Sequence, residues 1–248
     1  MKEGGKAYFA SDFHLGLRAG GDPSERERRV VSWLERCADD ASSIWLLGDI
    51  FDFWWEYRLV VPKGFTRFLG ALSRLTDSGI TVHYLTGNHD MWMGGYLEDE
   101  CGVRVRHGIV REQFNGHRFL LAHGEGLGTG ESRYRLLLAL FRNRFLRALY
   151  SSIHPRIGVA IGHRWSLRSR LGRGEHTPFL GAEHEDLINY SKLSLESEHT
   201  DYFIYGHRHL ALMHRLGEKS RVVLLGDWIG GESYAVWNGK EIELIGGD

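Results

Sequence analysis

The sequence has few cysteines and no long apolar run. Its 248 residues include only two cysteines, Cys37 and Cys101. Two thiols in a chain of this length do not form a disulfide framework, which favours a reducing compartment. No apolar run approaches the roughly 18 residues that cross a bilayer, and the four apolar residues before Ser11 are too few for a signal-peptide core. We therefore expect a cytoplasmic protein.

The chain as a whole also lacks an excess of one charge. Its formal net charge is -1, so we expect no nucleic-acid partner. The charge is unevenly distributed, however, because residues 127–173 contain ten Arg and one Glu. No repeat, low-complexity segment or linker divides the chain, so we expect residues 1–248 to form a single domain.

Apolar periodicity predicts helices alternating with strands in the first half of the chain and mostly strands at its end. The continuous apolar run 44–47, for example, is typical of a strand covered on both faces. This order predicts an α/β protein with mixed sheets covered by helices. We predict strands at 6–10, 44–47, 80–85, 104–106, 109–114, 117–122, 202–205, 212–216, 222–225, 234–237 and 242–245, and helices at 25–37, 64–77, 133–150, 157–168 and 184–197.

Polar residues follow five of the predicted strands, at the point where each strand ends. In an extended segment, residues two apart point to the same side, so both members of an Asp-x-His or His-x-His pair can reach one centre. A glycine beside several of these residues lets the backbone turn sharply as the strand ends. The residues at the five strand ends are Asp12 and His14, Asp49, Asn88 and His89, His123, and His207 and His209.

These residue types predict a metal site. Asp, Asn and His without a thiolate suit Mn²⁺, Fe, Zn²⁺ or Mg²⁺. Each motif alone has an ordinary explanation: coincidence for Asp-x-His, a turn for Gly-Asn-His-Asp, and an exposed loop for His207 and His209. Their joint occurrence after strands favours a site for two divalent metal ions. Such a pair, about 3.5–4 Å apart, holds a phosphate and activates a water for in-line attack.

The order and spacing of these motifs, from Asp12 to His209, resemble the calcineurin-like metallophosphoesterase superfamily. The resemblance implies a four-layer αββα sandwich with two metals at its strand ends. It also implies the ligands of each ion, with Asp49 as a bridge between them. One ion would be held by Asp12, His14, Asp49 and His209, and the other by Asn88, His123, His207 and Asp49.

His89 does not fit as a further ligand, because Asn88 takes the position at the end of that strand. We expect His89 to face the substrate, as a donor to the phosphate or a proton source for the leaving group. Asp90 could orient His89 as a carboxylate orients a catalytic imidazole. For Asp90 and Asp52, a structural role in capping or holding a turn is an equal alternative.

The insertion after His123 combines apolar residues with arginine. Part of its apolar face must be an ordinary helix face packed on the core. It nevertheless has more apolar residues than one narrow stripe needs, and basic, apolar helices fit an anionic membrane surface. We expect a helical cap at about residues 127–173 that docks on such a surface and wraps acyl chains. The interleaved arginines are Arg142, Arg144, Arg147, Arg156 and Arg164.

Five segments together resemble the UDP-2,3-diacylglucosamine diphosphatase family of lipid A biosynthesis: 48–54, 87–92, 123–128, 165–170 and 202–209. The resemblance implies hydrolysis of this nucleotide-sugar lipid to 2,3-diacylglucosamine 1-phosphate and UMP, usually with Mn²⁺, at the inner face of the cytoplasmic membrane. His89 and Glu125 depart from the better-known branch, which carries Arg and Asp there. The substrate contacts implied are Asn88, His89, Glu131, Ser166, Arg170 and His207.

Some alternatives stay open at this point. Ser166 and Arg170 could belong to a helix end packed on the core. A different metallophosphoesterase, such as a nucleotide or general phosphodiesterase, would need an open groove in place of an apolar cap. Members of this fold that are inactive interaction scaffolds typically lose metal ligands, whereas all seven positions are filled here. We infer no protein partner.

Overall fold

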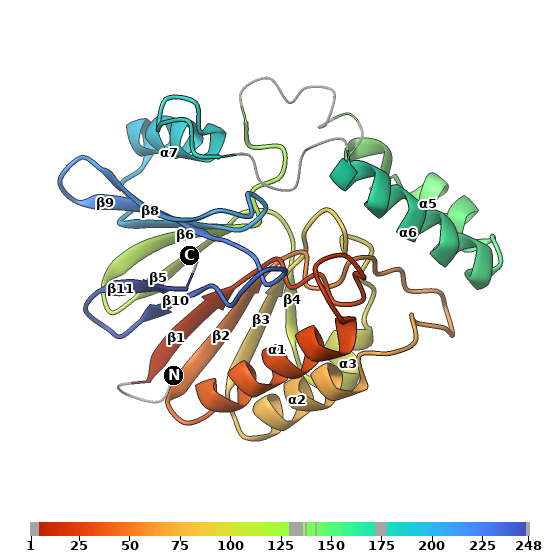
Figure 1. Ribbon diagram of the computed structural model, residues 1–248. Coiled ribbons are helices and arrows are strands. Elements are labelled where there is room, and N and C mark those ends of the chain that lie inside the picture. The colour runs from red at the N-terminus through yellow and green to blue at the C-terminus, as the bar shows by residue number, and fades with distance from the viewer. Residues whose placement is uncertain (1–4, 129–135, 137, 142, 172–177, 247–248) are drawn as a thin grey trace.

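The computed structural model describes residues 5–128, 136, 138–141, 143–171 and 178–246, without the side chains of 167–171. Within these residues the chain forms two β-sheets that pack face to face, with helices on both outer faces (Figure 1). This arrangement is the four-layer α/β sandwich predicted from the sequence.

The first sheet has the order β11-β10-β1-β2-β3-β4. Its strands β1 to β4 run parallel, as expected of strands joined by helical crossovers, and β10 and β11 add an antiparallel edge. All seven residues of β2 are buried, which fits a strand covered on both faces. The strands are β1 (Lys6–Ala10), β2 (Ala41–Leu47), β3 (Thr81–Leu85), β4 (Arg104–Arg106), β10 (Tyr234–Trp237) and β11 (Ile242–Ile245).

The second sheet has the order β5-β6-β7-β9-β8. Its central strands β6, β7 and β9 run parallel, whereas β5 and β8 pair antiparallel with their neighbours. The strands are β5 (Val110–Phe114), β6 (His117–Ala122), β7 (Tyr202–Tyr205), β8 (Ala211–Leu216) and β9 (Ser220–Leu225).

The layers are held together by three apolar cores. Between the sheets, Phe9 and Trp45 of the first sheet pack with Phe119 and Ile204 of the second. Outside the first sheet lie α1 (Pro23–Cys37), α2 (Thr66–Asp77) and α3 (Tyr96–Cys101), and outside the second lies α7 (Asp186–Ser197) (Figure 1). The six-residue α3 was not predicted, because so short a helix carries little periodicity. Cys37 and Cys101 are buried free thiols, as expected.

Two further helices, α5 (Arg144–Ser151) and α6 (Pro155–Leu171), lie to one side of the sandwich and are called the cap here (Figure 1). The prediction of one continuous helix over 133–150 was wrong. Residues 138–141 are helical, Asn143 is not, and α5 begins after it. The Asn143 side chain accepts hydrogen bonds from the backbone N–H groups of Phe145 and Leu146, so it caps a new helix. The α6 helix begins at Pro155, earlier than predicted, because proline suits a first helical turn.

The cap packs on the sandwich through an aromatic cluster. Phe53 and Trp55 follow β2, Met91 and Trp92 follow β3, and Leu138 joins them from the insertion. On α6, a side chain at Gly158 would collide with Tyr57, and one at Gly162 would collide with Phe53. These two glycines lie four residues apart, on one face of α6, and they let that face approach the loop after β2.

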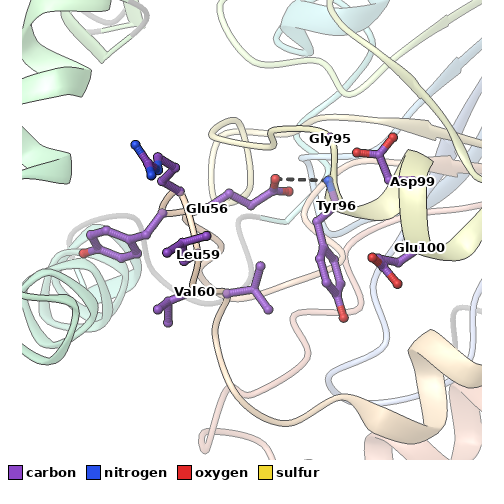
Figure 2. Close-up of a pocket in the computed structure, with 10 residues that line it drawn as sticks. Glu56, Leu59, Val60, Gly95, Tyr96, Asp99 and Glu100 are labelled. Carbon is purple, nitrogen blue, oxygen red and sulfur yellow. Dashed lines mark hydrogen bonds between the residues drawn. The ribbon is translucent and has the colours of Figure 1, made fainter.

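The loop after β2 also forms a pocket with the start of α3 (Figure 2). In this pocket the Glu56 carboxylate accepts hydrogen bonds from the Trp54 indole and from the backbone N–H of Tyr96, so it ties the loop to α3. None of the residues at the five predicted strand ends lines the pocket. Among the described residues, the helices all fall short of the length and apolarity that a membrane crossing requires.

Candidate metal centre

The polar strand ends of the two sheets meet at one place. Asp12 follows β1, Asp49 follows β2 and Asn88 follows β3, at the carboxyl ends of parallel strands in the first sheet. His123 and His207 follow the parallel strands β6 and β7 of the second sheet. The carboxyl ends of parallel strands are where α/β folds place their ligands.

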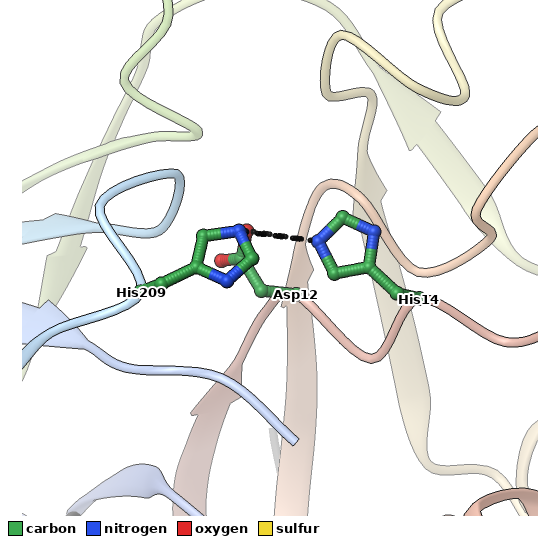
Figure 3. A group of neighbouring side chains, drawn as sticks. All are labelled: Asp12, His14 and His209. Atoms are coloured by element: carbon green, nitrogen blue, oxygen red, sulfur yellow. Dashed lines mark hydrogen bonds and ion pairs between the residues drawn. The ribbon is translucent and has the colours of Figure 1, made fainter. Parts of the chain in front are cut away.

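Asp12, His14 and His209 form one group of side chains (Figure 3). His209 Nε2 lies 3.3 Å from both Asp12 Oδ1 and His14 Nε2, and His14 Nε2 lies 3.7 Å from Asp12 Oδ1. Asp12 and His14 are fully buried, whereas His209 is partly exposed. A carboxylate and two imidazoles that converge in this way make a donor set for one divalent cation.

A second group adjoins the first and consists of Asp49, His123 and His207. His123 Nε2 lies 3.4 Å from Asp49 Oδ2. The same carboxylate oxygen lies 3.9 Å from His14 Nε2, so Asp49 reaches both groups. The backbone N–H of His207 donates to Asp12 Oδ2 at 2.9 Å, which ties the second group back to the first.

The hydrogen bonding of three buried polar atoms indicates whether the centre fits a cation. Asp12 Oδ1, Asn88 Oδ1 and His123 Nε2 have no hydrogen-bond partner among the described residues. Buried polar atoms are normally satisfied, and a carboxylate oxygen, an amide oxygen and an imidazole nitrogen are all cation donors. His123 Nδ1 donates to the Leu47 carbonyl oxygen at 2.8 Å, which turns Nε2 toward Asp49. The residues present therefore fit divalent metal ions.

The electrostatics of the centre show that its buried carboxylates need a positive charge nearby. Burial alone would raise the pKa of Asp49, but the imidazoles of His123, His89 and His14 outweigh it and hold that pKa well below its usual value. Burial alone would lower the pKa of His123, but Asp49 outweighs it and raises that pKa well above its usual value. Burial raises the pKa of Asp12. The buried carboxylates thus require positive charge nearby, from a proton or from a metal ion.

The backbone at the centre adopts an uncommon conformation. Five of the seven predicted ligands have φ values in the left-handed region, which residues other than glycine rarely adopt. Such strained residues cluster at functional sites, where the surrounding structure holds them in place. These residues and their φ values are Asp12 (54°), His14 (45°), Asp49 (53°), His207 (66°) and His209 (52°).

Two glycines at the strand ends leave room for the centre. A side chain at Gly48 would collide with His123 Nδ1 and with the backbone of Gly87. A side chain at Gly87 would collide with Asp49 Oδ1. The strand ends of β2 and β3 can therefore approach each other only because both positions are glycine.

His89 lies beside both groups with a defined ring orientation. Its Nδ1 donates to the backbone carbonyl oxygen of Asp52 at 2.9 Å, because a carbonyl oxygen can only accept. Its Nε2 lies 3.9 Å from Asp49 Oδ2, so this nitrogen faces the centre. The backbone N–H of His89 donates to Asp49 Oδ1 at 2.9 Å.

Asp90 has a structural role in this arrangement. Its carboxylate accepts hydrogen bonds from the backbone N–H of Gly87 at 2.7 Å, from that of Ile50 at 2.8 Å and from the Tyr84 hydroxyl at 2.5 Å. Burial, followed by the nearby charge of Asp49, raises the pKa of Asp90 to about 6. Of the two roles that the sequence left open for Asp90, the contacts favour the one that holds the turn.

Asp227 is a residue of the centre that the sequence analysis missed. His209 Nδ1 lies 3.1 Å from Asp227 Oδ2, and Asp227 Oδ1 accepts from the backbone N–H of Ile229 at 2.8 Å. A carboxylate on Nδ1 fixes the ring so that Nε2 faces the metal position. The signal was present in the sequence, because Gly226-Asp227 follows β9 as Gly48-Asp49 follows β2.

The structure describes the side chain of only one of the three substrate residues predicted in the insertion. Glu131 lies outside the described residues. Arg170 lies in the last turn of α6, and its side chain is also outside the description. Ser166 is buried, and its hydroxyl donates to Asp52 Oδ1 at 2.8 Å. The contact of these three residues with substrate stays a prediction.

Comparison with known proteins places the chain among phosphoesterases. The profile of the calcineurin-like phosphoesterase family matches residues 5–211. A UDP-2,3-diacylglucosamine hydrolase of Porphyromonas gingivalis is 44% identical over 253 aligned residues, which cover 96% of each chain. A protein of the same name from Nitrosococcus oceani is 26% identical and covers 91% of this chain and 88% of its own. A third, from Ectopseudomonas mendocina, is 28% identical and covers 88% of both.

Proposed function

The chain belongs to the calcineurin-like phosphoesterase family, and from this premise we propose that it hydrolyses the pyrophosphate bond of UDP-2,3-diacylglucosamine. Water is added across that bond, and the products are UMP and 2,3-diacylglucosamine 1-phosphate. The observation that carries the proposal is the convergence of two Asp/His groups on Asp49. The names and the full-length coverage of the similar hydrolases support the choice of substrate.

Seven residues hold two divalent cations in this proposal. The first group, with Asp49, holds one, and the second group, with Asn88, holds the other. When bound, the cations neutralise the phosphate oxygens and activate a water. We infer Mn²⁺ from the resemblance to the diphosphatase family, and the donors, all oxygen or imidazole nitrogen, also suit Fe, Zn²⁺ and Mg²⁺. The ligands are Asp12, His14, Asp49, Asn88, His123, His207 and His209.

His89 is the catalytic residue of the proposal. Because the Asp52 carbonyl oxygen accepts from Nδ1, the other nitrogen is the one that meets the phosphate. A protonated Nε2 donates to a phosphate oxygen or gives its proton to the leaving group. Asn88 and His207, at the ends of β3 and β7, border the same space and contact the phosphate as well.

The insertion that carries the cap selects the lipid in this proposal, with Glu131, Ser166 and Arg170 as its predicted contacts. It docks on the anionic surface of the cytoplasmic membrane. On α5, Phe145 is 77% exposed and Leu149 is 59% exposed. No described side chain of α5 is buried, and Arg144 adds positive charge to the same helix. An apolar face with flanking arginine fits the boundary between lipid headgroups and acyl chains.

The experiment that tests the function is incubation of the purified protein with UDP-2,3-diacylglucosamine and Mn²⁺, followed by identification of the products. We expect equimolar UMP and 2,3-diacylglucosamine 1-phosphate. A generic aryl phosphodiester is the comparison substrate. Turnover of the aryl ester alone would overturn the substrate assignment in favour of a nucleotide or general phosphodiesterase. A protein that binds no divalent metal would instead be an inactive scaffold.

A further inference from the structure

We propose that Asp52 is a positioning residue that couples the seating of the cap to the orientation of His89. Asp52 lies in the loop after β2, three residues beyond Asp49, and its side chain is buried. The inference rests on the proposed function, because it assigns to His89 a part in phosphoester hydrolysis.

The carboxylate of Asp52 contacts the cap, and one of its oxygens also lies within 4.8 Å of a ring nitrogen of His14 and of His89. Ser166 of α6 donates to its Oδ1 at 2.8 Å, and Nδ1 of His163, one turn earlier on α6, lies 3.6 Å from its Oδ2. Ser166 is itself 1% exposed, so no bulk water competes for this hydrogen bond. The two contacts join a loop of the sandwich to a helix 114 positions later in the chain.

The backbone of Asp52 also contacts residues of the metal centre. Its carbonyl oxygen accepts from His89 Nδ1 at 2.9 Å, and its N–H donates to the carbonyl oxygen of Leu15 at 3.0 Å. The residue before Leu15 is His14, whose backbone N–H donates to the Asp49 carbonyl oxygen. Asp52 therefore orients His89, hydrogen-bonds the loop that carries His14, and contacts the cap.

Small residues on one face of α6 let the cap approach the loop after β2. Gly158, Gly162 and Ser166 follow one another at intervals of four residues, so they lie on the same face of the helix. Gly158 approaches Tyr57, Gly162 approaches Phe53, and Ser166 binds Asp52. This face of α6 therefore lies along the loop, and it reaches Asp52 at the end nearest the metal centre. A shift of α6 moves the Asp52 carboxylate and, through the same residue, the carbonyl oxygen that orients His89.

The coupling is tested by steady-state kinetics of the full-length enzyme with Mn²⁺ on UDP-2,3-diacylglucosamine. We expect Asp52→Ala and Ser166→Ala each to lower kcat by about 10–100-fold, as loss of an orienting partner does. Asp52→Asn keeps an oxygen that accepts from Ser166, so it should retain more activity than alanine. Ser152→Ala is the matched control, because the Ser152 hydroxyl bonds within α5, and it should leave kcat unchanged.

A double-mutant cycle separates positioning from general stability. If Asp52 acts through His89, then Asp52→Ala should lower kcat far less in a His89→Ala protein than in the wild type. Equal losses in the two proteins would show that Asp52 acts independently of His89 and would overturn the proposal. Unchanged kcat in both alanine variants would overturn it as well. Metal analysis is the second measurement, and loss of an ion in Asp52→Ala would make Asp52 a ligand instead.

Failure of the proposed function gives a different result. In that case the wild type releases no UMP from the lipid substrate, and the same cycle is measured on the aryl phosphodiester that it does hydrolyse. His89 meets the phosphate of either substrate, so the interaction between Asp52 and His89 is still expected. Its absence there would overturn the coupling on its own.

Discussion

The metal centre and the cap differ in how far their key side chains are buried. At the metal centre Asp12, His14 and Asp49 are buried at the strand ends, and their backbone is held in a strained conformation. The cap exposes large apolar side chains, such as Phe145 and Leu149, and it meets the sandwich through an aromatic cluster and Asp52. The proposed chemistry is thus assigned to the more constrained region, and the proposed lipid selection to the more exposed one.

This difference suggests that the two regions can be altered separately. A change at the strand ends should remove hydrolysis of every phosphoester, because all substrates share the phosphate. A change on the outer face of the cap should affect only encounters with lipid. Asp52 is the place where this separation should fail, since it contacts both regions.

The largest effect is expected from Asp49→Ala. Asp49 reaches both groups of ligands, so its loss should reduce the metal content and bring activity on the lipid and the aryl ester below detection. Metal analysis and both assays check this result. Activity that survives on the aryl ester alone would contradict this expectation, because the centre would then not serve both substrates.

The next effect is expected from His89→Ala. Loss of a group that donates a proton or a hydrogen bond to the phosphate should lower kcat by about 10²–10⁴-fold. Because His89 is not assigned as a ligand, both metals should remain bound. An ion missing from the purified variant would contradict the role given to His89 and place it among the ligands.

A smaller effect is expected from Asp227→Asn. The amide cannot hold the His209 ring as firmly as the carboxylate 3.1 Å away, so metal affinity or activity should fall by about 10–100-fold. Titration of the metal-free protein with Mn²⁺ measures the affinity. Glu232→Gln is the matched control, since Glu232 pairs with Arg36 away from the centre, and it should bind Mn²⁺ as the wild type does. An unchanged titration of Asp227→Asn would remove Asp227 from the centre.

The smallest effect is expected on the outer face of the cap. The double variant Phe145→Ser, Leu149→Ser should bind anionic vesicles at least tenfold more weakly, because tenfold corresponds to about 1.4 kcal/mol and burial of each large apolar side chain contributes about 1.5–3 kcal/mol. Activity on the aryl ester should not change. Vesicle sedimentation measures binding, and added salt should weaken it further in the wild type. Leu193→Ser, at an exposed apolar position of α7, is the control. Equal binding by all three proteins would refute docking through α5.

Local sequence was enough to predict the helices, the strands and the polar residues at the strand ends, whereas the four-layer sandwich and the ligands of each ion came from the resemblance. The strand runs and the Asp-x-His and His-x-His spacings depend on neighbours in the chain, and they predicted mixed sheets covered by helices and side chains that converge at the strand ends. The break at Asn143 and the short α3 were missed, since periodicity over a few residues is weak. Glu131 and the side chain of Arg170 lie outside the described residues, so their roles remain predictions.

The sequence by itself therefore determined which residues converge at the strand ends, because a strand end and a spacing of two fix the direction of a side chain. Only the tertiary structure decided which residues support them. Asp227 meets His209 from a different strand end, and Ser166 meets Asp52 across 114 positions. The left-handed backbone at Asp12 and Asp49 is also decided by the fold, because the surrounding structure must hold that conformation in place.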